Sequence, residues 1–240
     1  MLAWRTRNRP RMRVLIVIPL YNEEDSIGRV LGEVRRRTPA DVLVVDDGST
    51  DRSPEVLGRF GWISMLRHRD NRGYGSCLIE GFRHGREHGY DAIVTIDADD
   101  QHEPALIPAL CAGLAEADIV SGSRYLAGSE RGQVAPRDRM RINQLVTSRI
   151  NQLTGFSLTD AFCGFKAYRG RALAKLELDE PSYGLPLQMW IQAARHGLTV
   201  REVAVGRIYP RPDRHFGGKL DRPCARLRYY LETMRKELAR

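Results

Sequence analysis

The amino-acid sequence predicts an α/β fold in which a mostly parallel sheet is flanked by helices. Short apolar runs rich in β-branched residues alternate with helix-like stretches along the first half of the chain, a pattern typical of strand-helix-strand units. Polar clusters follow four of these runs, at the places where open parallel sheets bind their ligands. With 240 residues, of which 42% are hydrophobic and 28% charged, the chain is long enough for one large domain with its own core.

The elements of the first half are expected to follow one another in alternation. Apolar runs predict strands at 14–20, 42–45, 63–66, 92–96 and 118–121. Helical periodicity predicts helices at 26–37, 75–88 and 104–116. Because crossovers of this kind join neighbouring strands, we expect the strands to run parallel.

The second half is less regular. Residues 126–140, with three Gly or Pro residues and five charges, predict a mobile loop, and long loops beside a binding edge often act as lids. Helices are expected from the end of this loop to about residue 153, at 185–196 and at 226–240, with a strand at 199–208.

The two ends of the chain differ in character from its body. Residues 1–11 lack periodicity and predict a disordered basic tail, residues 12–220 form the predicted domain, and 221–240 form a basic amphipathic helix. One face of that helix would carry Leu227, Leu231, Met234 and Leu238. Such a helix either packs on the domain or lies in a membrane interface.

Three acids follow the central strand at 92–96, and they indicate a metal site. Asp97 and Asp99 are two residues apart and would point the same way along a continuing strand, whereas Asp100 would point away. Carboxylate and amide oxygens suit Mg²⁺ or Mn²⁺, and Mg²⁺ usually completes its shell with substrate phosphates. The alternative is that these acids cap the helix that starts at Pro104, although capping explains one acid and not three.

Further polar clusters end the first, second and fifth strands, at 19–24, 46–48 and 122–124. Four polar strand ends at one edge predict a single site. A dinucleotide-binding Rossmann domain needs a glycine-rich turn after its first strand, and this turn has no glycine. Its GxG occurs instead at Gly73 and Gly75, with Leu78 where a third glycine belongs.

Cysteine spacing and hydropathy exclude other classes of protein. The four cysteines, at 77, 111, 163 and 224, show no CxxC pairing, which argues against a zinc site and a disulfide framework. The longest uninterrupted apolar run, at 14–18, is too short to span a bilayer, and the N-terminus lacks the core of a signal peptide. We therefore expect a cytoplasmic protein.

The net charge of +8 is unevenly distributed. Residues 1–13 carry five arginines and no acid, and residues 207–240 carry ten basic against four acidic residues. A chain with basic ends and an acidic middle is better suited to bind an anionic membrane surface or a phosphorylated substrate than a nucleic acid. The alternative is that the arginine-rich start is a solvated tail without a role.

Taken together, the motifs resemble a family 2 glycosyltransferase of the GT-A fold, most closely its polyprenol-phosphate (dolichol-phosphate) mannosyltransferase branch. The resemblance runs from about 12 to 219 and rests on six motifs in order. These are PLYNEE at 19–24, DDGSTD at 46–51, NRG at 71–73, the DAD of 97–99 followed by Gln101, GSR at 122–124, and Asp160 with CGFK at 163–166.

The resemblance implies a role for each matching residue. The nucleoside would be held by Pro19, Tyr21, Asn22, Glu23, Asp46 and Asp47. Asp97 and Ala98 would lie by the ribose and diphosphate, and Asp99 and Gln101 would bind the metal, Mg²⁺ or Mn²⁺. Arg124 would meet the donor phosphates or the acceptor, and Arg214 and Lys219 would reach in from a closing C-terminal segment. Carboxylates accept hydrogen bonds from ribose hydroxyls, and arginine forks onto phosphate oxygens, which agrees with these roles.

The sequence departs from the family pattern in two places and lacks one signature. Gln188 stands where this branch tends to carry an acidic residue, and Gly218 precedes Lys219 where a serine is common. The QxxRW motif of processive synthases is absent, so we do not expect polymer synthesis.

The expected activity is an inverting, metal-dependent transfer of a sugar from a nucleotide-diphosphate sugar, GDP-mannose first and UDP-glucose second, to a polyprenyl phosphate. A phosphate monoester is largely ionised at neutral pH and needs no protein base. For a hydroxyl-bearing or other soluble acceptor a base would be required, and Asp160 is the candidate. The competing hypothesis is a non-catalytic nucleotide-sugar-binding protein, favoured by Gln188. The charged C-terminus leaves open a peripheral contact with the inner face of the cell membrane or a membrane partner.

Overall fold

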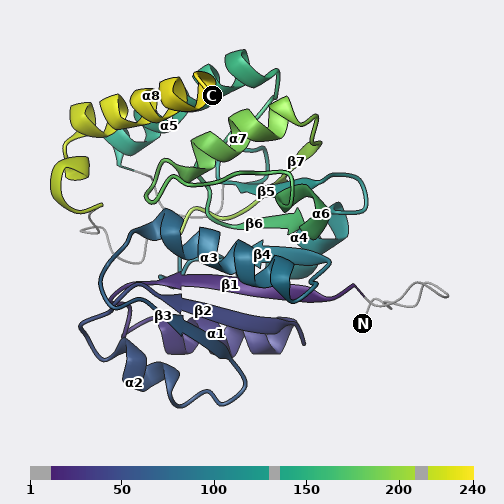
Figure 1. Cartoon of the computed structure of the whole chain (residues 1–240), viewed down its shortest axis with the longest axis vertical. Coiled ribbons are helices and arrows are strands. Elements are labelled where there is room, and N and C mark those ends of the chain that lie inside the picture. Colours follow the sequence, from purple (N-terminus) through teal and green to yellow (C-terminus); the bar gives the residue numbers. More distant parts are fainter. Residues whose placement is uncertain (1–11, 130–135, 209–215) are drawn as a thin grey trace.

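A computed structural model describes residues 12–129, 136–208 and 216–240. In this part of the chain a seven-stranded sheet has the strand order β3-β2-β1-β4-β6-β5-β7, with helices on both faces (Figure 1). The α/β class predicted from the sequence is confirmed, and the sheet is parallel except at β6.

The first half follows the predicted alternation closely. Its strands are β1 (Val14–Leu20), β2 (Asp41–Asp46), β3 (Ser64–Arg67) and β4 (Ala92–Thr95), all parallel. Its helices are α1 (Ile27–Arg37), a short α2 (Ser53–Leu57) that was not predicted, and α3 (Tyr74–Glu87). In the register of the sheet Leu20 lies beside Asp46 and Val17 beside Thr95, so the polar segments that follow these strands start at one edge.

Both faces of the sheet are buried, which explains the continuous apolar runs. Alternate residues of β1 point to opposite cores: Val17 belongs to the core that includes side chains of α3, α5 and α7, whereas Ile16 belongs to the core that includes α1 and α4. Helix α3 lies very close to the sheet, because a Cβ on Gly81 would stand 2.3 Å from Val17 Cγ1. Glycine at this position therefore lets α3 pack directly on β1.

After β4 the chain forms the 3₁₀ turn η1 (Pro104–Leu106), α4 (Ile107–Gly113) and β5 (Ile119–Ser123). The less regular second half then adds α5 (Arg137–Thr154), β6 (Lys166–Arg169) and α6 (Gly170–Leu173). Helix α7 (Leu185–Arg195) and β7 (Val200–Ala204) follow, and β7 pairs in parallel with β5. The long loop predicted for 126–140 is wrong in part, because α5 already begins at Arg137. The predicted tail at 1–11 and the loop residues 130–135 lie outside the described residues.

The sequence did not predict β6, which runs antiparallel between β4 and β5. Its first residue, Lys166, is 1% exposed and donates to the carbonyl of Cys163, with its ammonium 5.5 Å from the centre of the Trp190 ring. A four-residue strand that opens with a charged residue carries no apolar pattern, so nothing in the sequence distinguished it from a loop.

The C-terminal helix α8 (Pro223–Leu238) packs against α5 and α7, which is one of the two alternatives expected. Of the four residues expected on one apolar face, Met234 is buried and Leu227 is half-buried, whereas Leu231 and Leu238 are each 47% exposed. The buried face instead includes Arg226 and Glu237, which are 2% and 1% exposed. A buried cation and a buried acid therefore form part of the face that packs on the domain.

Candidate active site

The turns after β1 and β2 are joined by side-chain hydrogen bonds. Asn22, in the left-handed region at φ 55°, accepts from the Thr50 backbone N–H at 2.8 Å and donates its own N–H to Ser49 Oγ at 3.0 Å. Tyr21 is 44% exposed at this edge. Glu23 is buried, and its backbone N–H donates to Ser53 Oγ at 2.9 Å. The structure thus brings Pro19, Tyr21, Asn22 and Glu23 together with the segment that begins at Asp46, as the sequence predicted.

The two acids that end β2 have different surroundings. Asp46 is fully buried, accepts from the Ser49 N–H at 2.9 Å and lies 3.1 Å from the Nε of Arg67. Asp47 accepts from the backbone N–H groups of Arg72 and Gly73, each at 2.8 Å. Asp47 therefore holds the loop that leads into α3.

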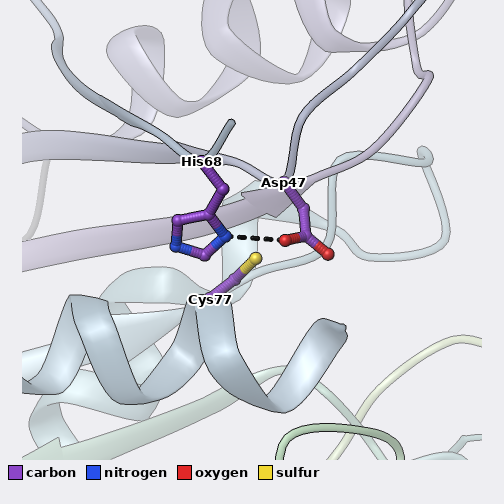
Figure 2. A group of neighbouring side chains, drawn as sticks. All are labelled: Asp47, His68 and Cys77. Carbon is purple, nitrogen blue, oxygen red and sulfur yellow. Dashed lines mark hydrogen bonds and ion pairs between the residues drawn. The ribbon is translucent and has the colours of Figure 1, made fainter. Parts of the chain in front are cut away.

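His68 and Cys77, which the sequence did not single out, complete the surroundings of Asp47. Figure 2 shows both side chains directed at its carboxylate. His68 Nδ1 lies 2.7 Å from Asp47 Oδ1, and since a carboxylate only accepts, Nδ1 carries the hydrogen. Burial and the hydrogen bond to Asp47 raise the pKa of the Cys77 thiol, which stays protonated.

These three residues have the donor types of a metal site, but their geometry is that of a hydrogen-bonded cluster. Two ligands of one tetrahedral zinc, with bonds of about 2.0 Å, stand about 3.3 Å apart. The 2.7 Å between nitrogen and oxygen is instead a hydrogen-bond distance. Because Asp47 accepts from three donors within the protein, its geometry favours positioning of the loop over direct contact with a nucleoside.

Asp97 is held by groups that come from three separate segments. Tyr74, at the start of α3, donates its hydroxyl to Asp97 Oδ1 at 2.9 Å. The Asp97 backbone N–H donates to His102 Nδ1 at 3.2 Å, and burial lowers the pKa of His102 to about 4, so the ring is neutral at physiological pH. Gly164 lies so close that a Cβ there would stand 2.6 and 2.7 Å from the two carboxylate oxygens.

Gly164→Ala tests how much the placement of Asp97 matters. The added methyl must displace the carboxylate, so we expect the KM for the nucleotide ligand to rise about tenfold, or about 1.4 kcal/mol, while the far-UV circular dichroism is retained. Gly32→Ala is the matched control, because a Cβ at Gly32 in α1 meets nothing within 4 Å. An unchanged KM in Gly164→Ala would show that the Asp97 position is not critical.

Asp99 and Gln101 lie in the turn that follows, because β4 already ends at Thr95. Asp99 is 9% exposed, and its Oδ1 accepts from the Gln101 backbone N–H at 3.0 Å. The continuing strand assumed for these acids is not present; Asp100, at φ 61° in the turn, pairs with Arg29 at 2.6 Å. None of the three acids caps the following helix, since its N-cap is Glu103 and makes no side-chain cap.

Ala98 is 3% exposed, so its side chain belongs to the core and only its backbone faces the turn. The donors that the turn offers, the Asp99 carboxylate and the Gln101 side-chain oxygen, are hard oxygens of the kind that Mg²⁺ and Mn²⁺ prefer. These residues therefore fit a divalent cation bound together with ligand phosphates.

Arg124, just after β5, makes a bidentate salt bridge with Asp160. Its Nε and Nη2 donate to Oδ2 and Oδ1 at 2.7 and 3.0 Å, and Asn143 Nδ2 donates to Oδ1 at 2.7 Å. Asp160 is fully buried; burial alone would raise its pKa, but Arg124 and these hydrogen bonds together hold the pKa below the ordinary value. A carboxylate so stabilised as an anion is unsuited to accept a proton, which opposes its predicted use as a general base.

Glu202 in β7, which the sequence did not single out, fixes the segment that carries Asp160. Its carboxylate accepts from the backbone N–H and the hydroxyl of Thr159 and from the N–H of Asp160, at 2.7 to 3.1 Å. Burial raises the pKa of Glu202. The pairing of β5 with β7 thus sets the position of Asp160 and, through it, of Arg124.

A family model for "Glycosyl transferase family 2" matches residues 15–177, a span that contains most of these groups. The chain belongs to glycosyl transferase family 2. It is therefore a glycosyltransferase, and the family predicted from the motifs is confirmed.

Two curated relatives and one solved structure illustrate the similarity. The transferase is 36% identical over 202 residues to undecaprenyl-phosphate mannosyltransferase of Micrococcus luteus, covering 81% of this chain and 83% of the relative. It is 31% identical over 212 residues to polyprenol monophosphomannose synthase of Mycolicibacterium smegmatis, covering 82% and 78%. Its fold matches glucosyl-3-phosphoglycerate synthase of Mycobacterium tuberculosis, a complex with Mn²⁺, UDP-glucose and phosphoglyceric acid, with a TM-score of 0.72, 22% identity and coverage of 95% and 80%. That likeness establishes the GT-A type fold.

Gln188 of the transferase has a structural role that explains the departure from an acidic residue. Its Oε1 accepts from the backbone N–H groups of Asp179 and Glu180, each at 3.0 Å. Its Nε2 donates to Asp179 Oδ1 at 2.7 Å and to Glu237 Oε2 at 2.9 Å. An acid at this position would place a third carboxylate against two others, whereas the amide satisfies both.

The C-terminal part of the transferase is connected to Asp97 through aromatic rings. Tyr183 stacks on Tyr74 with ring centres 5.6 Å apart, and Phe216 meets Tyr183 edge-on at 5.2 Å. The Arg226 guanidinium lies 4.6 Å from the centre of the Phe216 ring. Lys219 is exposed in the adjoining 3₁₀ turn η2 (Gly218–Asp221), and Arg214 lies outside the described residues.

Proposed function

We propose that the transferase moves a hexose, with inversion, from a nucleotide-diphosphate sugar to a polyprenyl phosphate. The similarity to two enzymes named for polyprenyl-phosphate mannosylation supports this acceptor and favours GDP-mannose as donor, with UDP-glucose second. The observation that carries the proposal is the bidentate pair between Arg124 and buried Asp160. This pair keeps Asp160 ionised and hydrogen-bonded, so Asp160 is not available as a general base.

An acceptor that supplies its own anionic nucleophile fits such a site. The second pKa of a phosphate monoester is about 6, so near neutral pH its oxygen attacks C1 of the sugar without proton transfer to the protein. A hydroxyl acceptor would require a base that Asp160 does not provide.

We assign the remaining roles from the resemblance to the family, and the geometry supports them. Tyr21 and Asp46 lie where the nucleoside would bind, with Asp47 fixing the loop beside it. Asp97, held by Tyr74, would face the ribose and diphosphate. Asp99 and Gln101 would hold Mg²⁺ or Mn²⁺, which neutralises the diphosphate leaving group when bound. Arg124 keeps its charge beside the acceptor phosphate, oriented by Asp160.

A thermal-shift panel with GDP-mannose, UDP-glucose and the free nucleotides, each with and without Mn²⁺, tests the donor. A ligand at about 100 times its dissociation constant stabilises the protein by about 2.7 kcal/mol, so the true donor should raise Tm only when the metal is present. No shift with any nucleotide sugar would contradict the proposal.

The acceptor is tested with a matched pair of lipids, a polyprenyl phosphate and the corresponding polyprenol. We expect transfer only to the phosphate, with a rate that falls below about pH 6 as the monoester becomes protonated. Equal transfer to the free alcohol would overturn the phosphate acceptor and require a different base.

A further inference from the structure

The outer faces of α5 and α8 carry alternating cations and leucines. On α5, Arg141, Leu145 and Arg149 are exposed at a spacing of four residues, which places them on one side of the helix. Leu145 is 59% exposed, whereas the opposite side of α5, with Ile142, is buried.

Helix α8 repeats the pattern next to α5. Arg228, Leu231, Arg235 and Leu238 follow one another at intervals of three or four residues and are exposed, and Lys236 adjoins them. The two helices contact one another and form an outer layer of the molecule (Figure 1). We call the exposed residues Arg141, Leu145, Arg149, Arg228, Leu231, Arg235, Lys236 and Leu238 the α5–α8 face.

The α5–α8 face carries a strong excess of positive charge. Its five cations make no ion pair with another described residue, and Glu232 is the one acid exposed among them on α8. Arg226, by contrast, is buried; its Nη2 donates to Asp138 at 2.6 Å and its Nη1 to the Leu220 carbonyl at 2.9 Å. Its role is therefore structural, and it is not part of the α5–α8 face. Unpaired cations beside exposed leucines are the features that bind an anionic bilayer.

The contact between Arg226 and Asp138 also orients the face. It ties the start of α8 to the start of α5, and Asn143 of α5 donates to Asp160, the partner of Arg124, at 2.7 Å. The N-terminal part of the α5–α8 face therefore lies near Arg124.

We propose that the α5–α8 face docks the transferase on an anionic membrane surface, so that a lipid-linked phosphate reaches Arg124 from the headgroup layer. This inference rests on the proposed polyprenyl-phosphate acceptor. Among the described residues, no helix has the length and apolar character needed to cross a bilayer. The contact proposed for this face is peripheral, made by side chains on the outside of two packed helices.

Binding of the full chain to vesicles tests the proposal. Sedimentation with phosphatidylglycerol-containing vesicles should exceed that with pure phosphatidylcholine vesicles, and salt should reverse it. In the triple variant Arg228→Gln/Arg235→Gln/Lys236→Gln we expect binding about a hundredfold weaker, because each cation near the surface contributes about fivefold. Leu145→Ser with Leu231→Ser should weaken binding at any salt concentration.

The matched control removes three exposed cations elsewhere, Arg59→Gln/Arg86→Gln/Lys175→Gln, with the same change in net charge. The proposal is overturned if this control loses binding as strongly as the α8 triple variant, or if the parent binds both vesicle types equally or neither. Transfer to a short, water-soluble isoprenyl phosphate without vesicles should be unchanged in the α8 triple variant. Absence of that transfer in the parent would contradict the proposed function. Vesicle binding tests the docking face independently of that function.

Discussion

Asp99→Asn should abolish sugar transfer while the protein stays folded. The substitution keeps an oxygen that can accept the Gln101 N–H but removes the charge that would bind the cation. A metal stabilises a developing diphosphate charge by several kcal/mol, so we expect turnover to fall by at least about a thousandfold. Asparagine is preferred to alanine because Asp99 is 9% exposed, and not the exposed acid that a strand end suggests.

Asp100→Asn provides the matched control. Asp100 is the adjacent acid, but it points away and pairs with Arg29 on the surface. An exposed pair of this kind contributes at most about 1 kcal/mol, so this variant should retain metal-dependent turnover. Both variants are assayed at increasing Mn²⁺ concentrations after treatment with chelator. If Asp99→Asn in metal-free buffer turned over as fast as the parent does with Mn²⁺, the metal site would be refuted.

The strand ends of the site were predictable because they depend on local sequence. An apolar run such as 14–20 or 92–96 must be buried, and a polar cluster directly after it must lie at the sheet edge. The turns at 19–24 and 46–51 and the acids at 97, 99 and 100 were therefore predictable from the order of residues alone, and the fold places the two turns together.

The groups that hold these acids were not predictable in the same way. Tyr74, His102 and Gly164 meet at Asp97 from separate segments, and Glu202 reaches Asp160 from a strand 42 residues further along the chain. None of them carries a periodic signal, because each owes its position to a tertiary contact.

The C-terminal helix shows a second limit of periodicity. The spacing grouped four apolar residues on one face, but Leu231 is exposed while Arg226 and Glu237 are buried, since each finds a charged partner on another helix. Burial of charge is decided by its partners, which the helix sequence alone does not contain.

Arg124 and Asp160 are expected to show the largest effect on stability. Arg124→Ala leaves the fully buried Asp160 carboxylate without its cation, and removal of one partner of a buried pair costs about 3–5 kcal/mol of unfolding free energy. Arg124→Lys keeps the charge but not the fork, so we expect a smaller loss of stability and a fall in kcat/KM of about tenfold or more.

A double variant separates the structural contribution from the chemical one. Arg124→Met/Asp160→Leu replaces the pair by apolar side chains, a change that is often neutral for stability, so it should recover much of the stability lost in Arg124→Ala. If Arg124 acts on the acceptor phosphate, turnover stays absent in the folded double variant. Recovered turnover would limit Arg124 to a structural role.

The pH dependence of unfolding gives an independent measure of the pair. The folded-state pKa of Asp160 lies below its unfolded value of about 3.9, so its stabilising contribution is fully present above that value and is lost as pH falls toward the folded pKa. In urea titrations, the parent should therefore lose stability between about pH 5 and pH 2.5 more steeply than Asp160→Asn does. Parallel curves for the two proteins would mean that Asp160 is not held as a stabilised anion, and the case for an acceptor that needs no protein base would lose its support.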